Sequence, residues 1–269
     1  MSGAFAKPRG VQHVNRADPF GRLMTSGWLF NGPSVSTGVC ERDICGRSHL
    51  NALSMTGNPF SYVSSPYGTV LDRAGTANTD TMIFTGPVGN IVIPSTPTFT
   101  IVTRMFLRAL PNYSNVFTFG SASGFFIRGI LSGTEAKMDF FQGGENVAVT
   151  ALLANTWISV AVQCLKGVIS YFYYDPVVGF TGDPGNPFAN TIAGGFTINN
   201  MFSDSGSEYF NGQPDYFYYF GTTAIPQKSL ELLMADPYRV VRRRNVALLK
   251  ASGVAAARQQ TLTLLGMGA

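Results

Sequence analysis

Short runs of alternating side chains, separated by turn sequences, fill the middle of this chain and restrict its fold more than any other feature. In residues 98–110, every second residue from Phe99 is apolar or β-branched, as expected for a strand with one face on a core. Turn sequences such as GDPGNP, SDSGS and NGQP lie between the runs. The runs are 90–94, 98–110, 115–121, 124–131, 137–143, 147–153, 156–165, 167–175, 194–200 and 214–222. This pattern predicts an all-β protein, an antiparallel β-sandwich or jelly roll.

One short helix is predicted after the last strand, within residues 222–241. Pro226 suits its first turn, and Asp236 followed by Pro237 would end it, because a residue before proline avoids helical backbone angles. The apolar face of this helix would consist of Leu230, Leu233 and Met234.

Charge divides the chain into an acidic middle and two basic ends. The 269 residues have a formal net charge of +4, yet residues 239–269 hold six basic residues and no acidic one. Residues 1–26 are also basic and contain proline and glycine without apolar periodicity. We therefore expect a domain at 27–241 between two extended basic arms, 1–26 and 242–269, which would dock on acidic surfaces. The docking residues would be Arg239, Arg242, Arg243, Arg244, Lys250, Arg258, Leu262 and Leu264.

Nucleic acid and membranes are not expected as partners. The basic run has no interleaved aromatic residues, and the chain has no nucleic-acid-binding motif. No apolar run approaches the ~20 residues of a membrane span, and the first residues lack the apolar core of a signal peptide. Three cysteines, an odd number, argue against a disulfide-framed secreted domain, so we expect synthesis in a reducing cytoplasm.

No enzymatic activity is expected from the arrangement of acidic and nucleophilic residues. A jelly-roll glycosidase would need carboxylates on one face of a strand, about 5–5.5 Å apart for a retaining reaction. The five glutamates do not form such a run, both histidines precede the core strands, and no G-x-S-x-G sequence is present. The glutamates are Glu41, Glu135, Glu145, Glu208 and Glu231.

Metal sites have few candidate ligands. The stretch VCERDICGRSHL (39–50) holds Cys40, Cys45 and His49, three of the four ligands that a structural zinc site usually requires. A turn flanked by small, half-buried cysteines explains the same residues, so we expect no metal there. Calcium is the alternative cofactor, although its candidate ligands lie in sequences that form turns without a metal. These ligands would be Asp183, Asp204 and Glu208.

Aromatic residues alternate along two predicted strands, ISYFYYD (169–175) and DYFYYFG (215–221). Because they lie on both faces, the outer face of the sheet should also be covered, and a partner protein would cover it. The alternatives are a platform on which sugar rings stack and simple packing in the core and at the sheet edges. The candidate binding face consists of Tyr171, Tyr173, Tyr216, Tyr218 and Phe220.

The order of segments resembles that of laminin-G/concanavalin-A-like jelly-roll domains, of the type abundant in virion proteins of tailed bacteriophages. The resemblance covers 27–241 and is carried by GWLFN (27–31), RDICGRSHLNALSMTG (42–57), 155–175 and, best of all, 210–241. The residues on family motifs are Trp28, Asp43, Gly46, His49, Trp157, Gly212, Asp215 and Pro237. Cys45, Pro214 and Ser229 depart from the family pattern, which usually has serine, isoleucine and glutamate there.

The resemblance implies a non-enzymatic structural component of a phage virion, made in the host cytoplasm. It would be a capsid decoration (cement) protein or a protein associated with head or tail fibres. Its partners would be other capsid, tail or fibre proteins and further copies of itself, bound through the arms and the aromatic face. The alternative is a carbohydrate- or receptor-binding module on a phage tail or bacterial surface, because one fold hosts several functions.

Overall fold

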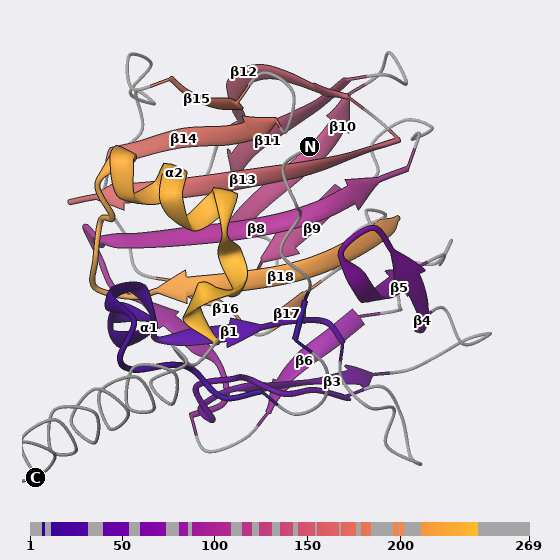
Figure 1. The fold of residues 1–269 in the computed structure, drawn as a ribbon. Helices are drawn as coiled ribbons and strands as arrows, with labels where there is room; N and C mark the ends of the chain where they lie inside the picture. Colours follow the sequence, from indigo (N-terminus) through magenta and orange to yellow (C-terminus); the bar gives the residue numbers. More distant parts are fainter. Residues whose placement is uncertain are drawn as a thin grey trace, which may run out of the picture.

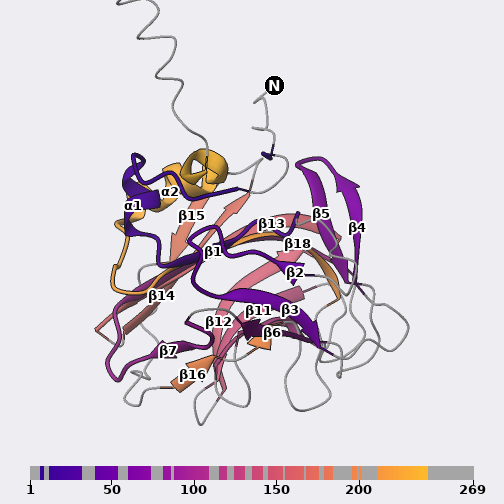
Figure 2. The ribbon, with the colours of Figure 1, turned by 90° about the horizontal axis from the view of Figure 1, so that it is seen from below.

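Two antiparallel sheets lie face to face and form a β-sandwich (Figures 1 and 2). The computed structural model describes residues 7–8, 12–31, 40–53, 60–73, 81–85, 88–108, 115–119, 124–130, 135–141, 145–153, 155–166, 168–175, 179–183, 196–198, 200–201 and 211–241. The predicted all-β fold is confirmed, and each predicted run overlaps a strand.

The front sheet, which carries the helices on its outer face in Figure 1, has eight strands. In spatial order they are β15 (Gly179–Asp183), β14 (Val168–Asp175), β13 (Thr156–Leu165), β8 (Phe99–Leu107), β18 (Gly212–Phe220), β5 (Gly68–Arg73) and β4 (Phe60–Ser65), with β1 (Ser26–Trp28) also paired to β18. Central strand β8 pairs along its length with β13 and β18.

The back sheet also has eight strands. They are β12 (Glu145–Leu153), β11 (Glu135–Phe141), β10 (Gly124–Ile130), β9 (Asn115–Phe119), β17 (Asn200–Met201), β6 (Thr81–Thr85), β3 (His49–Leu53) and β2 (Cys40–Glu41). A separate pair joins β16 (Phe196–Ile198) to β7 (Ile91–Ile93).

A bulge interrupts β18 where the family pattern is broken by Pro214. Proline has no backbone N–H, so inside a sheet it is tolerated only where the ladder is irregular. The register with β8 shifts between Pro214 and Tyr216, which leaves Asp215 as the extra residue without a partner on β8. The bulge therefore frees the backbone of Asp215 for contacts outside the sheet.

The predicted helix is present as two short elements. Helix α2 (Gln227–Ala235) follows Pro226, and the 3₁₀ helix η1 (Pro237–Val240) begins at the proline that ends α2. The predicted apolar face is confirmed, because Leu230, Leu233 and Met234 are the buried residues of α2. Among the described residues, no helix is long and apolar enough to cross a membrane.

The outer face of the front sheet is covered by elements of the same chain. Helix α2, η1 and helix α1 (Pro19–Leu23) lie over it in Figure 1, and their apolar side chains join those of β8, β13 and β18 in one buried cluster. The predicted aromatic face falls in this cluster in part. Tyr216, Tyr218 and Phe220 are fully buried, so the prediction that they bind a partner is wrong for these three residues.

The described N-terminal residues also differ from the prediction of an extended arm. Asp18 caps α1 by accepting hydrogen bonds from the backbone N–H groups of Phe20 and Gly21. Phe20 and Met24 belong to the buried cluster, and Lys7 is buried against the sandwich. These residues form part of the domain, which therefore extends across the predicted boundary at residue 26.

Candidate functional site

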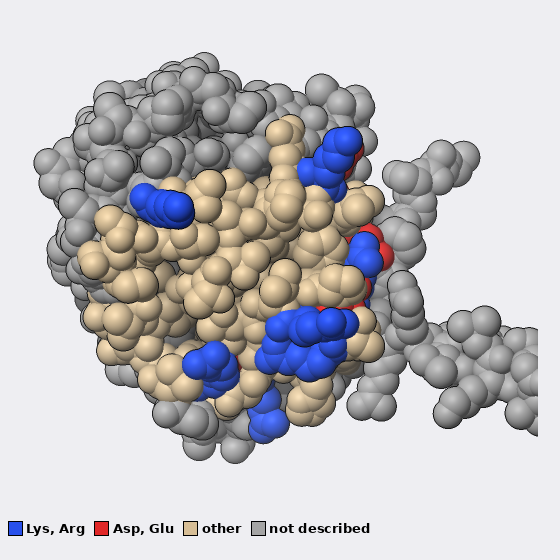
Figure 3. Space-filling model, turned by 90° about the vertical axis from the view of Figure 1, so that its left-hand side faces the viewer, with Lys and Arg blue, Asp and Glu red and all other residues tan. Residues whose placement is uncertain are grey.

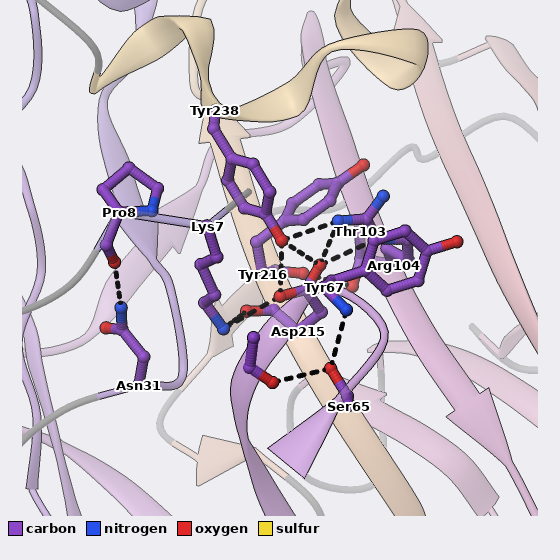
Figure 4. Close-up of polar contacts among 11 residues, drawn as sticks. Lys7, Pro8, Asn31, Ser65, Tyr67, Thr103, Arg104, Asp215, Tyr216 and Tyr238 are labelled. Atoms are coloured by element: carbon purple, nitrogen blue, oxygen red, sulfur yellow. Dashed lines mark hydrogen bonds and ion pairs between the residues drawn. The ribbon is translucent and has the colours of Figure 1, made fainter. Parts of the chain in front are cut away.

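A buried ion network is centred on Asp215, at the bulge of β18 (Figure 4). Its carboxylate accepts a hydrogen bond from Arg104 Nε at 2.7 Å and contacts Lys7 Nζ at 2.8 Å. The Tyr238 hydroxyl lies 2.7 Å from Asp215 Oδ2 and donates to this carboxylate. Lys7 Nζ also donates to the Asp215 backbone carbonyl at 2.8 Å. The network thus joins the N-terminal segment, β8, β18 and η1.

The electrostatics of this network favour the ionised form of Asp215. Burial alone would raise the pKa of Asp215, but the charges of Lys7 and Arg104 hold that pKa below its usual value. Burial lowers the pKa of Lys7, although the nearby Asp215 opposes this shift. The side chains of Lys7 and Asp215 are only 1% and 0% exposed. We therefore interpret Asp215, which the sequence places on a family motif, as a structural residue.

Residues 41–50 form a turn that is held by Asp43. The Asp43 carboxylate accepts four backbone hydrogen bonds at 2.8–3.0 Å. The backbone N–H of Asp43 donates to His49 Nδ1 at 3.1 Å. Gly46 has a φ of +74°, a conformation that side-chain-bearing residues rarely adopt. The four N–H donors belong to Gly27, Cys45, Arg47 and Ser48.

Within the described part of the chain, no three His, Cys, Asp or Glu residues are placed to hold a metal ion. Burial and the adjacent Asp43 raise the pKa of the Cys45 thiol to about 12, so the thiol stays neutral near pH 7. Of the candidate calcium ligands, Asp183 ends β15, while Asp204 and Glu208 lie outside the described residues.

Three aromatic rings are partly exposed on the outer face, beyond the part that α2 and η1 cover. Trp157 on β13 lies directly opposite Phe106 on β8, with ring centroids 5.7 Å apart. Tyr67, from the turn between β4 and β5, meets Trp157 edge-on at 5.2 Å. All three side chains are half-buried. We call Tyr67, Phe106 and Trp157 the aromatic platform.

Charged side chains fix the surroundings of the aromatic platform. The guanidinium carbon of Arg104 lies 3.5 Å from the centroid of the Tyr67 ring, a cation–π contact that ties the platform to the Asp215 network. Arg108, the residue that follows β8, forms an ion pair with Asp72. It also donates to Asn211 Oδ1 at 3.1 Å. Polar groups that can bind hydroxyls therefore lie just beyond the end of β8 that carries Phe106.

The other predicted site residues are distributed differently. Arg239 pairs with Asp18 at 2.9 Å, so this predicted docking residue is engaged within its own chain. Tyr171 and Tyr173 lie on β14, for which only the backbone is described. Trp157, predicted as a fold residue, belongs to the platform. The remaining docking residues, Arg242, Arg243, Arg244, Lys250, Arg258, Leu262 and Leu264, lie outside the described residues.

The motif residues of the family resemblance occupy structural positions. Trp28 on β1 is fully buried, and its indole N–H donates to the Ser48 carbonyl at 2.9 Å. Gly212 begins β18, and Pro237 begins η1. Sequence reasoning missed two platform residues. Phe106 could be placed on the outer face by strand alternation, but Tyr67 carries no local signal because it comes from a turn.

Comparison with known proteins shows the fold. No family model matches the chain, and no curated protein sequence matches it. Domain 4 of AbnA, an extracellular GH43 arabinanase from Geobacillus stearothermophilus solved with arabinotriose, matches with a TM-score of 0.50 at 13% identity, over 78% of this chain and 98% of that one. The binding domain of Paraclostridial Mosquitocidal Protein 1 matches with a TM-score of 0.52 at 14% identity, over 80% of this chain and 52% of that one.

A third similar structure is the sialidase of Trypanosoma rangeli in complex with sialic acid. It matches with a TM-score of 0.55 at 10% identity, over 90% of this chain and 37% of that one. The chain thus spans nearly the whole arabinanase domain, but only about half of the toxin domain and a third of the sialidase. At such low identities, these similarities show a shared β-sandwich architecture.

Proposed function

We propose that this chain is a non-enzymatic carbohydrate-binding module whose ligand stacks on the aromatic platform. The observation that carries the proposal is the partial exposure of Tyr67, Phe106 and Trp157 on the sheet face that α2 and η1 cover in part. Aromatic rings beside a few fixed polar groups are typical of sites that bind small polar ligands. The arabinanase domain with bound arabinotriose supports this reading through its shared architecture.

The acidic residues near the platform support binding without hydrolysis. Asp72 is paired with Arg108, and Asp215 is buried among Lys7, Arg104 and Tyr238. Glu41 is also buried and accepts a hydrogen bond from the Tyr62 hydroxyl at 2.8 Å. A glycosidase requires an acid and a base or nucleophile that reach the glycosidic bond, and these carboxylates are engaged within the protein.

Replacing Trp157 by alanine is expected to weaken glycan binding about tenfold or more, because a stacked ring contributes at least about 1.4 kcal/mol. A glycan array would identify the ligand of the wild-type protein, and isothermal titration calorimetry would measure its affinity. Leu165→Ala is the matched control, because Leu165 is an exposed apolar residue at the other end of β13. Equal affinities of folded Trp157→Ala, Phe106→Ala and wild-type protein would contradict the proposal.

The second candidate function is a structural component of a phage virion, attached through its C-terminal residues. The family resemblance favours it, together with the run from 242 to 269, which holds five basic residues and no acidic one. Figure 3 adds that Lys and Arg side chains gather on one described face, where few acidic side chains show. Both candidates are compatible, because a particle-bound module can also bind a glycan.

Truncation after Val241 is expected to abolish incorporation into phage particles while the domain stays folded. Val240 and Val241 are buried in the cluster beneath α2, so this end point removes none of the described packing. Quantitative mass spectrometry of purified particles would measure the copy number. Hundreds of copies would indicate capsid decoration, and about a dozen or fewer would indicate a tail or fibre. Full occupancy by the truncated protein would contradict docking through residues 242–269.

A further inference from the structure

The N-terminal segment is fixed against the turn that carries one ring of the aromatic platform. The backbone N–H of Lys7 donates to the Tyr67 carbonyl at 3.2 Å. The carbonyl of the next residue, Pro8, accepts a hydrogen bond from Asn31 Nδ2 at 2.8 Å (Figure 4). Beyond the backbone, Lys7 Nζ reaches into the core and binds Asp215. Lys7 therefore connects the turn to the buried ion network.

The turn between β4 and β5 has a defined shape that brings it into contact with Lys7. Ser65 Oγ accepts a hydrogen bond from the Tyr67 N–H at 3.1 Å and donates to the Gly68 carbonyl at 2.8 Å. Gly68 has a φ of +115°, and a Cβ atom there would lie 3.3 Å from Lys7 Cβ. The internal bonds set the curvature of the turn, and the Lys7 N–H joins it to the N-terminal segment.

The position of the turn determines where the Tyr67 ring lies. This ring lies over the Arg104 guanidinium and touches Trp157, and Arg104 is itself held by Asp215. The two other rings of the platform stand on the central strands β8 and β13, which are fixed by their ladder. Tyr67 is thus the platform residue whose placement depends on contacts made by the N-terminal segment.

We propose that the N-terminal segment, through Lys7, is a positioning element of the aromatic platform. It holds Tyr67 against Arg104 and Trp157, so the ring is preorganised before a ligand arrives. The effect on affinity rests on the proposed carbohydrate-binding function, whereas the effect on the geometry of the rings does not. If Lys7 only stabilised the fold, replacing Lys7 would leave the environment of Trp157 unchanged.

Tryptophan fluorescence can test the geometry without a ligand. The chain has two tryptophans, and Trp28 is fully buried, so quenching of the native protein by acrylamide reports mainly on Trp157. In the full-length chain, Lys7→Met is expected to increase the quenching constant about twofold and to weaken glycan binding about tenfold, because preorganisation is lost. A Trp157→Phe variant should lack most of the quenchable signal.

The matched control is Arg239→Met, which breaks the ion pair between η1 and Asp18, a contact of the N-terminal region that involves neither the turn nor Arg104. It is expected to lower stability while leaving the quenching and the glycan affinity at their wild-type values. Asn31→Ala, which frees the Pro8 carbonyl but leaves every charge in place, replaces Lys7→Met if that variant does not fold. As in Lys7→Met, the quenching constant of Asn31→Ala should increase and its glycan affinity should decrease.

The outcomes separate the two proposals. Unchanged quenching in folded Lys7→Met, or in Asn31→Ala if it must stand in, would overturn the positioning role. Increased quenching in a protein that binds no glycan on the array would support the positioning role and overturn the carbohydrate-binding function. If the wild-type protein binds a glycan, increased quenching with unchanged affinity would overturn the proposed control of binding by Lys7.

Discussion

Asp215→Asn is expected to lower the free energy of unfolding by about 3–5 kcal/mol, the usual cost of removing one partner from a buried ion pair. The substitution keeps the size of the side chain but removes the negative charge that Lys7 and Arg104 share. These two cations would then face each other in the protein interior, where burial strongly disfavours an uncompensated charge. Urea unfolding followed by circular dichroism would measure the loss.

Asp72→Asn is the matched control, because Asp72 pairs with Arg108 on the same sheet but nearer to solvent. The Arg108 side chain is 29% exposed, compared with 9% for Arg104. We expect this control to cost about 1 kcal/mol or less. Similar losses for the two variants would show that Asp215 does not hold a desolvated network.

The acid side of the stability curve gives an independent check. The folded-state pKa of Asp215 lies below its usual value, because Lys7 and Arg104 outweigh the effect of burial. Such a carboxyl stabilises the folded state fully above its unfolded pKa of about 3.9, and this contribution is lost as the pH falls. Below about pH 4, the free energy of unfolding should therefore fall more steeply for the wild-type protein than for Asp215→Asn.

The strands were predictable because alternation is a local property of the sequence. In β13, the predicted run 156–165 matches the bounds of the strand. The placement of the N-terminal residues was not predictable in the same way. Lys7 contacts a residue 208 positions away, and nothing in the composition of its neighbourhood indicates that partner. Basic residues near proline and glycine suggest an arm until the buried acid that binds one of them is known.

The candidate site was partly predictable for a similar reason. Alternation places Phe106 and Trp157 on outer faces, but it cannot say which part of that face the helices cover. Tyr216 and Tyr218 have the same alternation and lie beneath α2 and η1. Tyr67 joins the platform through long-range structure, because β4 and β5 pair as a hairpin at the sheet edge. A binding face therefore depends on coverage, which is a tertiary property.

Because α2 covers the outer face, replacing each of two adjacent leucines by alanine should change the free energy of unfolding by very different amounts. Leu233 is fully buried in the cluster with Tyr216 and Tyr218, whereas Leu232 is 58% exposed. Leu233→Ala should lower the free energy of unfolding by about 2–5 kcal/mol, because it removes apolar contacts and leaves a cavity. Leu232→Ala should change it by no more than about 0.5 kcal/mol.

The same pair of variants decides whether the aromatic strand β18 is a core strand or a binding face. Both substitutions change leucine to alanine within one helix, so differences in helix propensity cancel between them. Urea unfolding at one pH would measure both. If the two variants were equally stable, α2 would not pack on the sheet, and Tyr216, Tyr218 and Phe220 would be available to a partner. A loss confined to Leu233→Ala would instead restrict ligand binding on this face to the end that α2 leaves open, where the aromatic platform lies.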